Sequence, residues 1–479
     1  MTRPPDHFSD SLTGPVFKTL SSCGCTIMGD GWTDVRQRNL INFLVYSPMG
    51  IAFVKSIDAS DAVKDATLFS KLFLEVIEWV RVSNVVHMVT DNGANYKAAG
   101  GLVNATYKSI NWSPCAAHCL NLILSEISKM NHVHELAIKA SKVTRYIYNR
   151  SWLLARLRKK KSWTEIVRPG ATRFATTFLA LHSIHEHMHD LQALVTSKEF
   201  ASSRFAKEKK GKDAIDIILD KQFWKDCFII VKIVEPLMCL LRIVDGDEKP
   251  SMGYVYEGMY REIKGIKDIF KRNKRLYRPY TTIIKTRWDD QLRNNIHAAT
   301  YWLNPTFQYD QASFCKKPEV MNSVLDVIET KATSSKTKLM DELRLFRDRQ
   351  DSFGRELAII TSKKTQPDSV LGQLFGQQRS VFENSVLQLV NINYIPRALW
   401  VGGRRLNRSR NLIDGQAVFI SLPLVARRRS RRRSVSVQRL SNQWFLNSQA
   451  EVLVPTTELN ISIVQSNPDN MAGLKAMMR

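Results

Sequence analysis

The first 130 residues alternate short apolar runs with amphipathic stretches. Apolar or β-branched runs closed by turn-forming residues predict strands at 24–31, 40–46, 51–57 and 85–90. The turn Ser47–Gly50 joins the second run to the third and predicts a hairpin. Apolar residues at helical spacing predict one helix over 65–80 and another over 114–130, with Pro114 at the start of the latter.

The order of these elements predicts a defined sheet. A further helix is expected after the fourth strand, so the order is βββαβα. A right-handed crossover then places the fourth strand parallel to the first and beside it. This is the layout of the ribonuclease H-like fold, and we expect an α/β core at 23–130 built on a mixed five-stranded sheet with helices. Residues 1–22 are expected to be poorly ordered.

Helical periodicity dominates from 131 to 360. The predicted helices span 132–158, 174–197, 213–244, 252–272, 280–303 and 318–348. We interpret this region as a large all-α insertion that interrupts the core, together with the helices that complete the core. Beyond 361 no amphipathic stripe lasts three turns, which predicts a degenerate, Arg-rich and largely disordered tail over 361–479.

Two aspartates lie at the ends of two predicted strands. Asp30 closes the first apolar run, and Asp91 follows Val85–Thr90. If these strands are neighbours, the carboxylates meet at one edge of the sheet, where hard oxygen ligands suit Mg²⁺ or Mn²⁺ in phosphodiester chemistry. Each aspartate taken alone could instead cap the segment that follows it. Asp34 is the alternative to Asp30 in such a site.

Charge narrows the class of partner. The chain has 70 Lys and Arg against 45 Asp and Glu, a net charge of +25. Such an excess predicts attraction to polyanions, with nucleic acid the first candidate and an acidic membrane surface the second. Residues 397–439 hold twelve Arg against Asp414 and supply +11 of that charge. Their run Arg427–Arg433 fits a nuclear-localisation or nucleic-acid patch, or the translation of decayed sequence. No apolar run approaches a membrane span, so we expect a soluble, intracellular protein without a membrane partner.

Three motifs carry a family resemblance. Gly29–Asp34, Val89–Asn95 and Cys115–Asn121 are ordered and spaced as in plant transposases of the hAT superfamily, in the subgroup with a domain of unknown function ahead of the helical region. Further matching stretches are Arg168–Phe178, Asp247–Tyr256 and Ala298–Pro305. The chain resembles this family over about residues 23–360.

The resemblance implies a ribonuclease H-like domain whose Asp-Asp-Glu triad binds divalent metal. Asp30 and Asp91 stand at the two Asp positions of the family, so both are expected to be catalytic and to bind Mg²⁺ or Mn²⁺ in an active enzyme. It also implies that His118 lies beside the metal and contacts DNA, unless it is a core histidine. Arg173 and Phe174 stand where many relatives have Arg-Trp and could hold DNA by stacking a base, or Phe174 could be a core residue.

A zinc site is the other metal site that this region could form. Cys115, His118 and Cys119 would share one face of a helix, and Cys23 and Cys25 lie on the first strand. Because no second Cys/His pair has the spacing of a zinc finger, zinc is not expected.

The chain departs from the family at both ends. Residues 366–376 lack the Trp pair of relatives, and no Glu occurs from 384 to 450, where the third carboxylate and the dimerisation region fall. Glu257 and Glu356 are the alternative sources of that carboxylate. Nothing before residue 23 resembles the BED zinc finger with which relatives bind their terminal repeats. A homo-oligomer through the C-terminal region is therefore expected to be weakened.

The sequence favours a hAT-type transposase-derived, nuclear, DNA-binding protein whose Asp-Asp-Glu strand-transfer site is incomplete. The alternative is a domesticated, non-catalytic nuclear protein that binds DNA or protein on the same fold. The ancestry is that of a transposase or nuclease, but without the third carboxylate the sequence does not establish activity.

Overall fold

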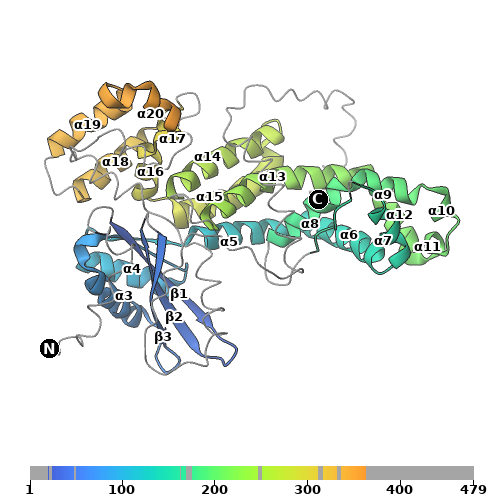
Figure 1. Ribbon diagram of the computed structural model, residues 1–479, viewed down its shortest axis with the longest axis horizontal. Coiled ribbons are helices and arrows are strands. Elements are labelled where there is room, and N and C mark those ends of the chain that lie inside the picture. Colours follow the sequence, from blue (N-terminus) through green and yellow to red (C-terminus); the bar gives the residue numbers. More distant parts are fainter. Residues whose placement is uncertain are drawn as a thin grey trace. The chain divides into compact units, whose positions relative to one another are not determined.

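A computed structural model of the protein describes residue 20 and residues 24–47, 50–161, 163–168, 175–245, 251–310, 317–331 and 336–362 (Figure 1). The predictions for 1–22 (Leu20 apart) and for the tail from 363 onward lie outside the described residues. The chain divides into two compact units. Among the described residues, the first draws on 20–120, 240–260 and 285–362, and the second on 121–239 and 261–284.

The first unit is built on a mixed five-stranded sheet. Its strands are β1 (Cys25–Thr33), β2 (Asn39–Ser47), β3 (Gly50–Asp58), β4 (Val85–Thr90) and β5 (Asn111–Pro114), in the order β3-β2-β1-β4-β5. β1 pairs antiparallel with β2 and parallel with β4, as the crossover rule required. The predicted fold class, an α/β ribonuclease H-like core, is confirmed.

The fifth strand is where the predicted boundaries were wrong. Pro114 was expected to begin a helix, but it ends β5, where it is paired with Thr90, and helix α5 (Ala116–Lys129) starts two residues later. β5 is only four residues long and contains Asn, Trp, Ser and Pro, so it has no apolar run from which a strand could be predicted. A proline is tolerated there because β5 lies at the edge of the sheet and needs no further donor on its outer side.

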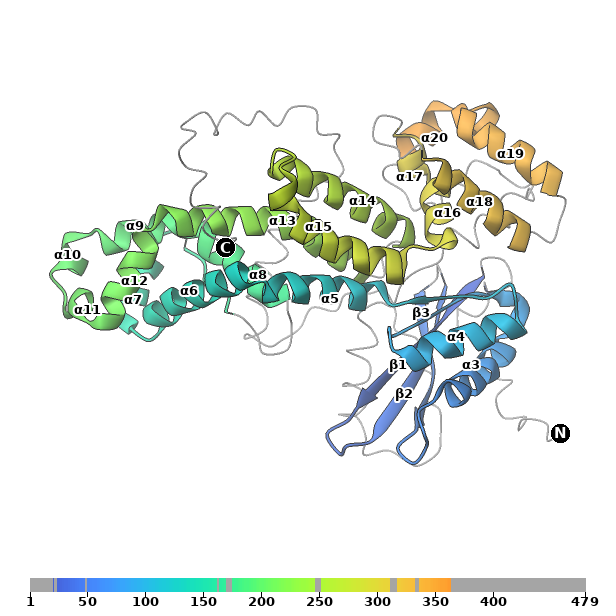
Figure 2. The same cartoon turned by 180° about the vertical axis from the view of Figure 1, so that it is seen from behind.

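Helices α3 (Ala66–Val80) and α4 (Ala94–Thr106) cover one face of the sheet (Figures 1 and 2). α3 begins where the side chain of Asp65 accepts a hydrogen bond from the amide of Leu68 at 2.8 Å, a typical N-cap. Its buried Phe73 packs edge-on against Phe43 of β2, with ring centroids 5.0 Å apart. This aromatic contact lies in the apolar core between the sheet and the helices.

Helices make up the rest of both units. The first unit contains α16 (Asn295–Leu303), α17 (Pro305–Gln308), α18 (Pro318–Lys331), α19 (Lys336–Asp348) and α20 (Glu356–Thr361). The second contains α6 (Asn131–Tyr148), α7 (Ser151–Arg158), α8 (Ala175–Glu186), α9 (Met188–Val195), α10 (Lys198–Ala201), α11 (Arg204–Lys207) and α12 (Lys209–Leu219). α5, α13 (Lys221–Asp245), α14 (Met252–Ile269) and α15 (Lys274–Arg287) contribute residues to both units. None of the described helices is long and apolar enough to cross a membrane.

Several of the predicted long helices are divided, among them 174–197, which is interrupted at His187 between α8 and α9. The stretch 132–158 is interrupted at Asn149 and Arg150, between α6 and α7, and 213–244 is interrupted at Asp220. The stretch 280–303 contains a π-helical turn, Trp288–Leu292, and a new start at Asn294, whose side chain caps α16. None of these breaks contains Pro or Gly, so no helix-breaking residue marked them in the sequence.

Gly29 is required by the close approach of β1 to α3. A Cβ atom on Gly29 would lie 2.2 Å from Cζ of Phe73, which is fully buried. We expect Gly29→Ala to lower the free energy of unfolding of the sheet by about 1–3 kcal/mol, the usual cost of overpacking a core. Native-state hydrogen exchange of the β1 and β4 amides measures this change.

Gly101 provides the matched control. It lies in α4, and a Cβ atom there would meet nothing within 4 Å. Gly101→Ala should therefore stabilise the unit by roughly 0.5–1 kcal/mol through helix propensity. Exchange in Gly29→Ala as slow as in the wild type would contradict the close contact between Gly29 and Phe73.

Candidate active site

The structure places Asp30 and Asp91 side by side. In the parallel pairing of β1 with β4, Gly29 lies opposite Thr90, so the next residue of β1 is Asp30 and the residue that follows β4 is Asp91. The two carboxyl groups lie within hydrogen-bonding reach of each other. The juxtaposition expected from the sequence is therefore present, while the catalytic and metal-binding roles of the two residues stay predictions.

The carboxyl end of β4 is held in place by β5. The Thr90 hydroxyl donates to the carbonyl oxygen of Asp91 at 2.9 Å and accepts from the Trp112 indole N–H at 2.9 Å. The backbone N–H of Cys115 donates to the Thr90 carbonyl at 2.7 Å. These bonds fix the backbone at Asp91, so the position of its carboxylate depends on the short edge strand.

The environment of the pair favours one bound proton. Burial, the charge of Asp91 and a hydrogen bond with Asp91 together raise the pKa of Asp30 to about 7. Burial also raises the pKa of Asp91, against the opposing effects of the charge of His118 and the hydrogen bond from Asp30. Two carboxylates so close cannot both ionise without cost, unless a cation replaces the shared proton.

His118 lies near this pair on the first turn of α5. Its side chain is exposed, so the interpretation as a core histidine is wrong, and its charge lowers the pKa of Asp91. Cys115 and Cys119 on either side of it are buried free thiols. Burial is the main cause that raises the pKa of Cys119 to about 12. Cys23, the other candidate zinc ligand of the sequence, lies outside the described residues.

Tyr96 is a residue of the site that the sequence reasoning missed. A Cβ atom on Gly31 would lie 2.7 Å from the Tyr96 hydroxyl oxygen, so the hydroxyl approaches β1 beside Asp30. Burial, and then the charges of Asp91 and Asp30, raise the pKa of Tyr96. Its ring stacks on Phe69 with centroids 4.2 Å apart. The only signal in the sequence was its place in the first turn of the helix that follows Asp91.

Asp34 is engaged in the connection between β1 and β2. One carboxylate oxygen accepts from the backbone N–H groups of Arg36 and Arg38 at 2.8 and 2.9 Å. The other accepts from the Arg38 guanidinium at 2.9 and 2.8 Å. Burial raises the pKa of Asp34, but these bonds outweigh it and hold the pKa below its ordinary value. The structure gives Asp34 a role in the turn, which argues against it as the substitute for Asp30.

No third carboxylate joins the pair in the part of the chain that the structure describes. Within those residues, no group of three or more His, Cys, Asp and Glu is placed to hold a metal ion. Glu257 is buried in α14 and Glu356 is exposed on α20, and neither completes a triad with Asp30 and Asp91. Residues 384–450, and the predicted DNA contacts Arg173 and Phe174, lie outside the described residues.

The comparisons with known proteins concern the same region. No curated protein matches the chain. Residues 15–143 match the family model described as "Domain of unknown function (DUF659)", and this match contains β1, β4 and both aspartates of the pair. The match fits a transposase-like domain family of the hAT type, in agreement with the motifs of the sequence.

Proposed function

We propose that this protein is a DNA-binding derivative of a hAT-type plant transposase that acts in the nucleus. In this proposal Asp30 and Asp91 are two members of an Asp-Asp-Glu strand-transfer site. The observation that carries it is the juxtaposition of their carboxyl groups at the carboxyl ends of parallel β1 and β4. The match over residues 15–143 supports the ancestry.

The donor set of the pair suits a hard divalent cation. Two half-buried carboxyl groups within hydrogen-bonding reach present oxygen ligands and gain from neutralisation. Asp30 and Asp91 would hold Mg²⁺ or Mn²⁺, which when bound supplies activation of water or a 3′-hydroxyl and charge stabilisation at phosphorus. In this proposal His118, which is exposed and whose charge acts on Asp91, would donate a hydrogen bond to a DNA phosphate oxygen.

The alternative is a non-catalytic nuclear protein that keeps the fold and binds DNA or protein. It is favoured by one observation: no third carboxylate lies with the pair among the described residues, and no Glu occurs from 384 to 450. The two functions differ in whether a metal-loaded pair can cut DNA, not in the presence of the pair. A homo-oligomer through the C-terminal region is compatible with either.

The pH dependence of stability tests the electrostatics of the pair. The pKa of Asp30 is about 7 in the folded protein, against roughly 4 in an unfolded chain. Its contribution to stability is therefore complete below about pH 4 and is lost as the pH rises through 7. Asp30→Asn should raise the free energy of unfolding above pH 7 by on the order of 1–4 kcal/mol, with no change at pH 4. Urea unfolding of both proteins from pH 4 to 8 measures the difference, and a constant offset would contradict the assignment.

Divalent metal should stabilise the wild-type protein through the same pair. With a dissociation constant near 1 mM, addition of about 10 mM Mg²⁺ or Mn²⁺ stabilises the folded state by roughly 1.4 kcal/mol. Asp91→Asn should abolish this shift in melting temperature. Asp61→Asn is the control, because Asp61 is an exposed carboxylate of the same unit. An equal metal shift in Asp91→Asn would exclude the pair as the binding site.

A Mn²⁺-dependent strand-cleavage assay separates the proposed function from its alternative. For a catalytic pair, Asp91→Asn should lower the cleavage rate about a hundredfold or more, because an inner-sphere ligand is worth several kcal/mol of barrier. Equal cleavage by both proteins would remove the catalytic assignment. Metal stabilisation without cleavage by the wild type would favour the non-catalytic alternative.

A further inference from the structure

A strongly basic surface lies in the second unit, on α6, α7 and the segment that follows them. From Lys142 to Arg168 the chain has nine Lys and Arg against the single Glu165, a formal charge of +8. The proposed active site uses none of these residues. The question is whether the positive charge is balanced within the unit or is available to a partner.

Four of the nine cations are balanced. Arg150 forms an ion pair with Glu208, and Arg156 lies 3.5 Å from a carboxylate oxygen of Glu199. The other two pairs are Arg158 with Glu165 at 2.7 Å and Lys160 with Asp190 at 2.6 Å.

The remaining five cations are Lys142, Arg145, Lys159, Lys161 and Arg168. All five side chains are exposed, and none forms an ion pair with a described residue. The excess charge is thus concentrated at residues that face solvent.

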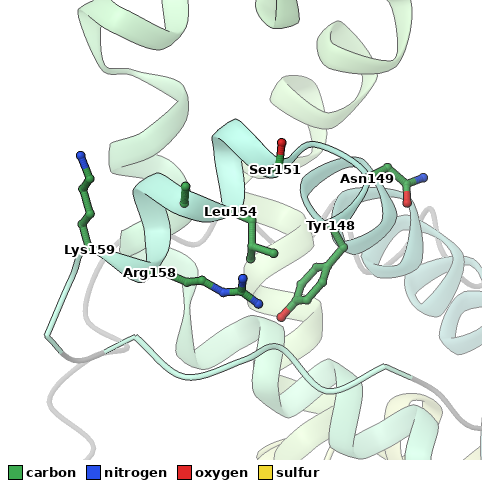
Figure 3. Close-up of a pocket in the computed structure, with 7 residues that line it drawn as sticks. Tyr148, Asn149, Ser151, Leu154, Arg158 and Lys159 are labelled. Carbon is green, nitrogen blue, oxygen red and sulfur yellow. The ribbon is translucent and has the colours of Figure 1, made fainter.

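A pocket of about 710 Å³ opens between the end of α6 and α7 (Figure 3). Its lining includes Tyr148, Asn149, Ser151, Leu154, Arg158 and Lys159. Figure 3 shows the side chains of Tyr148 and Arg158 pointing toward each other beside Leu154, with Lys159 beyond the end of α7. The pocket therefore joins two cations to the neutral hydrogen-bonding groups of Asn149 and Ser151.

The only acidic residue of the segment is used to hold this pocket in shape. The Tyr148 hydroxyl donates to one oxygen of Glu165 at 2.7 Å, and Arg158 Nε donates to the other at 2.7 Å. The backbone N–H of Ile166 donates to the Tyr148 hydroxyl, and the Arg168 guanidinium lies 5.0 Å from the centroid of the Tyr148 ring. Glu165 neutralises one of the three cations, Arg158, Lys159 and Arg168, so the pocket region keeps a formal charge of +2.

We propose that the pocket together with Lys159, Lys161 and Arg168, here called the α7 basic surface, binds the phosphate backbone of nucleic acid. This inference rests on the proposed DNA-binding function and names the surface that performs it in the second unit. Exposed Lys and Arg neutralise phosphates and release counterions, and the guanidinium of Arg158 retains donors for a phosphate oxygen. Such contacts position a strand without reading its sequence.

Nucleic acid fits this surface better than an acidic protein does. Protein interfaces depend on buried aromatic or aliphatic anchors, but none of the large apolar side chains exposed among the described residues lies between 142 and 168. Leu153, Leu154 and Leu157 of α7 are buried, and Trp152 is covered by the Arg156 guanidinium at 4.4 Å. The surface offers charge and hydrogen bonds, which is what a sugar-phosphate backbone requires.

Lysine acetylation of the full-length protein, with and without a 30-base-pair DNA duplex, tests this surface directly. Lys159 and Lys161 should be acetylated at least about fivefold more slowly with DNA, as read by mass spectrometry of their peptides. Lys209 and Lys210, exposed on α12 of the same unit, are the internal control and should react at unchanged rates. This readout is specific to each lysine, so DNA binding by the Arg-rich tail does not obscure it.

The salt dependence of binding gives a second measurement. Each lost phosphate contact lowers the slope of log K against log salt by about 0.9, so Lys159→Ala/Lys161→Ala/Arg168→Ala should lower it by about 2–3. The control Lys209→Ala/Lys210→Ala/Lys212→Ala removes the same charge and should leave the slope unchanged. Circular dichroism of both variants verifies that they fold.

The outcomes separate this inference from the proposed function. Unprotected Lys159 and Lys161, or equal slopes for the two triple variants, would overturn the α7 basic surface while the chain still binds DNA. Protection by polyglutamate but not by DNA would assign the surface to an acidic protein and overturn the inference as well. Asp61→Asn should retain both the protection and the slope, because Asp61 is an exposed carboxylate outside both the α7 basic surface and the proposed metal pair.

Discussion

The parallel pairing of β1 with β4 is the contact on which the rest of the first unit depends. Its register, with Gly29 opposite Thr90, brings Asp30 beside Asp91. The neighbouring positions of β1 are Gly29 and Gly31, where the absence of a Cβ atom leaves room for Phe73 and the Tyr96 hydroxyl. A shift by one residue would exchange the two faces and would lose the core and the carboxyl pair together.

The carboxyl pair lowers the stability of the fold at neutral pH, which argues that the two acids are not there for packing alone. A half-buried acid whose pKa lies near 7 beside a second acid would be removed easily by a neutral substitution if it served only the core. A cation offsets the repulsion. The chemistry of the pair is therefore compatible with the proposed metal site. The proposed function and its alternative both retain the pair.

The two units present opposite electrostatic problems. In the first, two acids lie together, while in the second the α7 basic surface has more positive charge than its single acid Glu165 can balance. In the proposed functions, a divalent cation would complete the first arrangement and a polyanion the second. A protein that handles DNA with metal needs both.

Local patterns determined the strands of the hairpin, the helix α3 and the positions of Asp30 and Asp91, because apolar periodicity and turn residues are read within a few positions of the chain. They could not locate β5, which is stabilised by pairing with β4 and not by its own composition. These local patterns also could not show that Asp34 forms an ion pair with Arg38, that His118 is exposed, or that the charges of Asp30 and Asp91 act on Tyr96. The sequence by itself determined which acids could meet. Only the tertiary structure decided what surrounds them, since pKa, exposure and hydrogen bonding depend on groups brought together from distant parts of the chain.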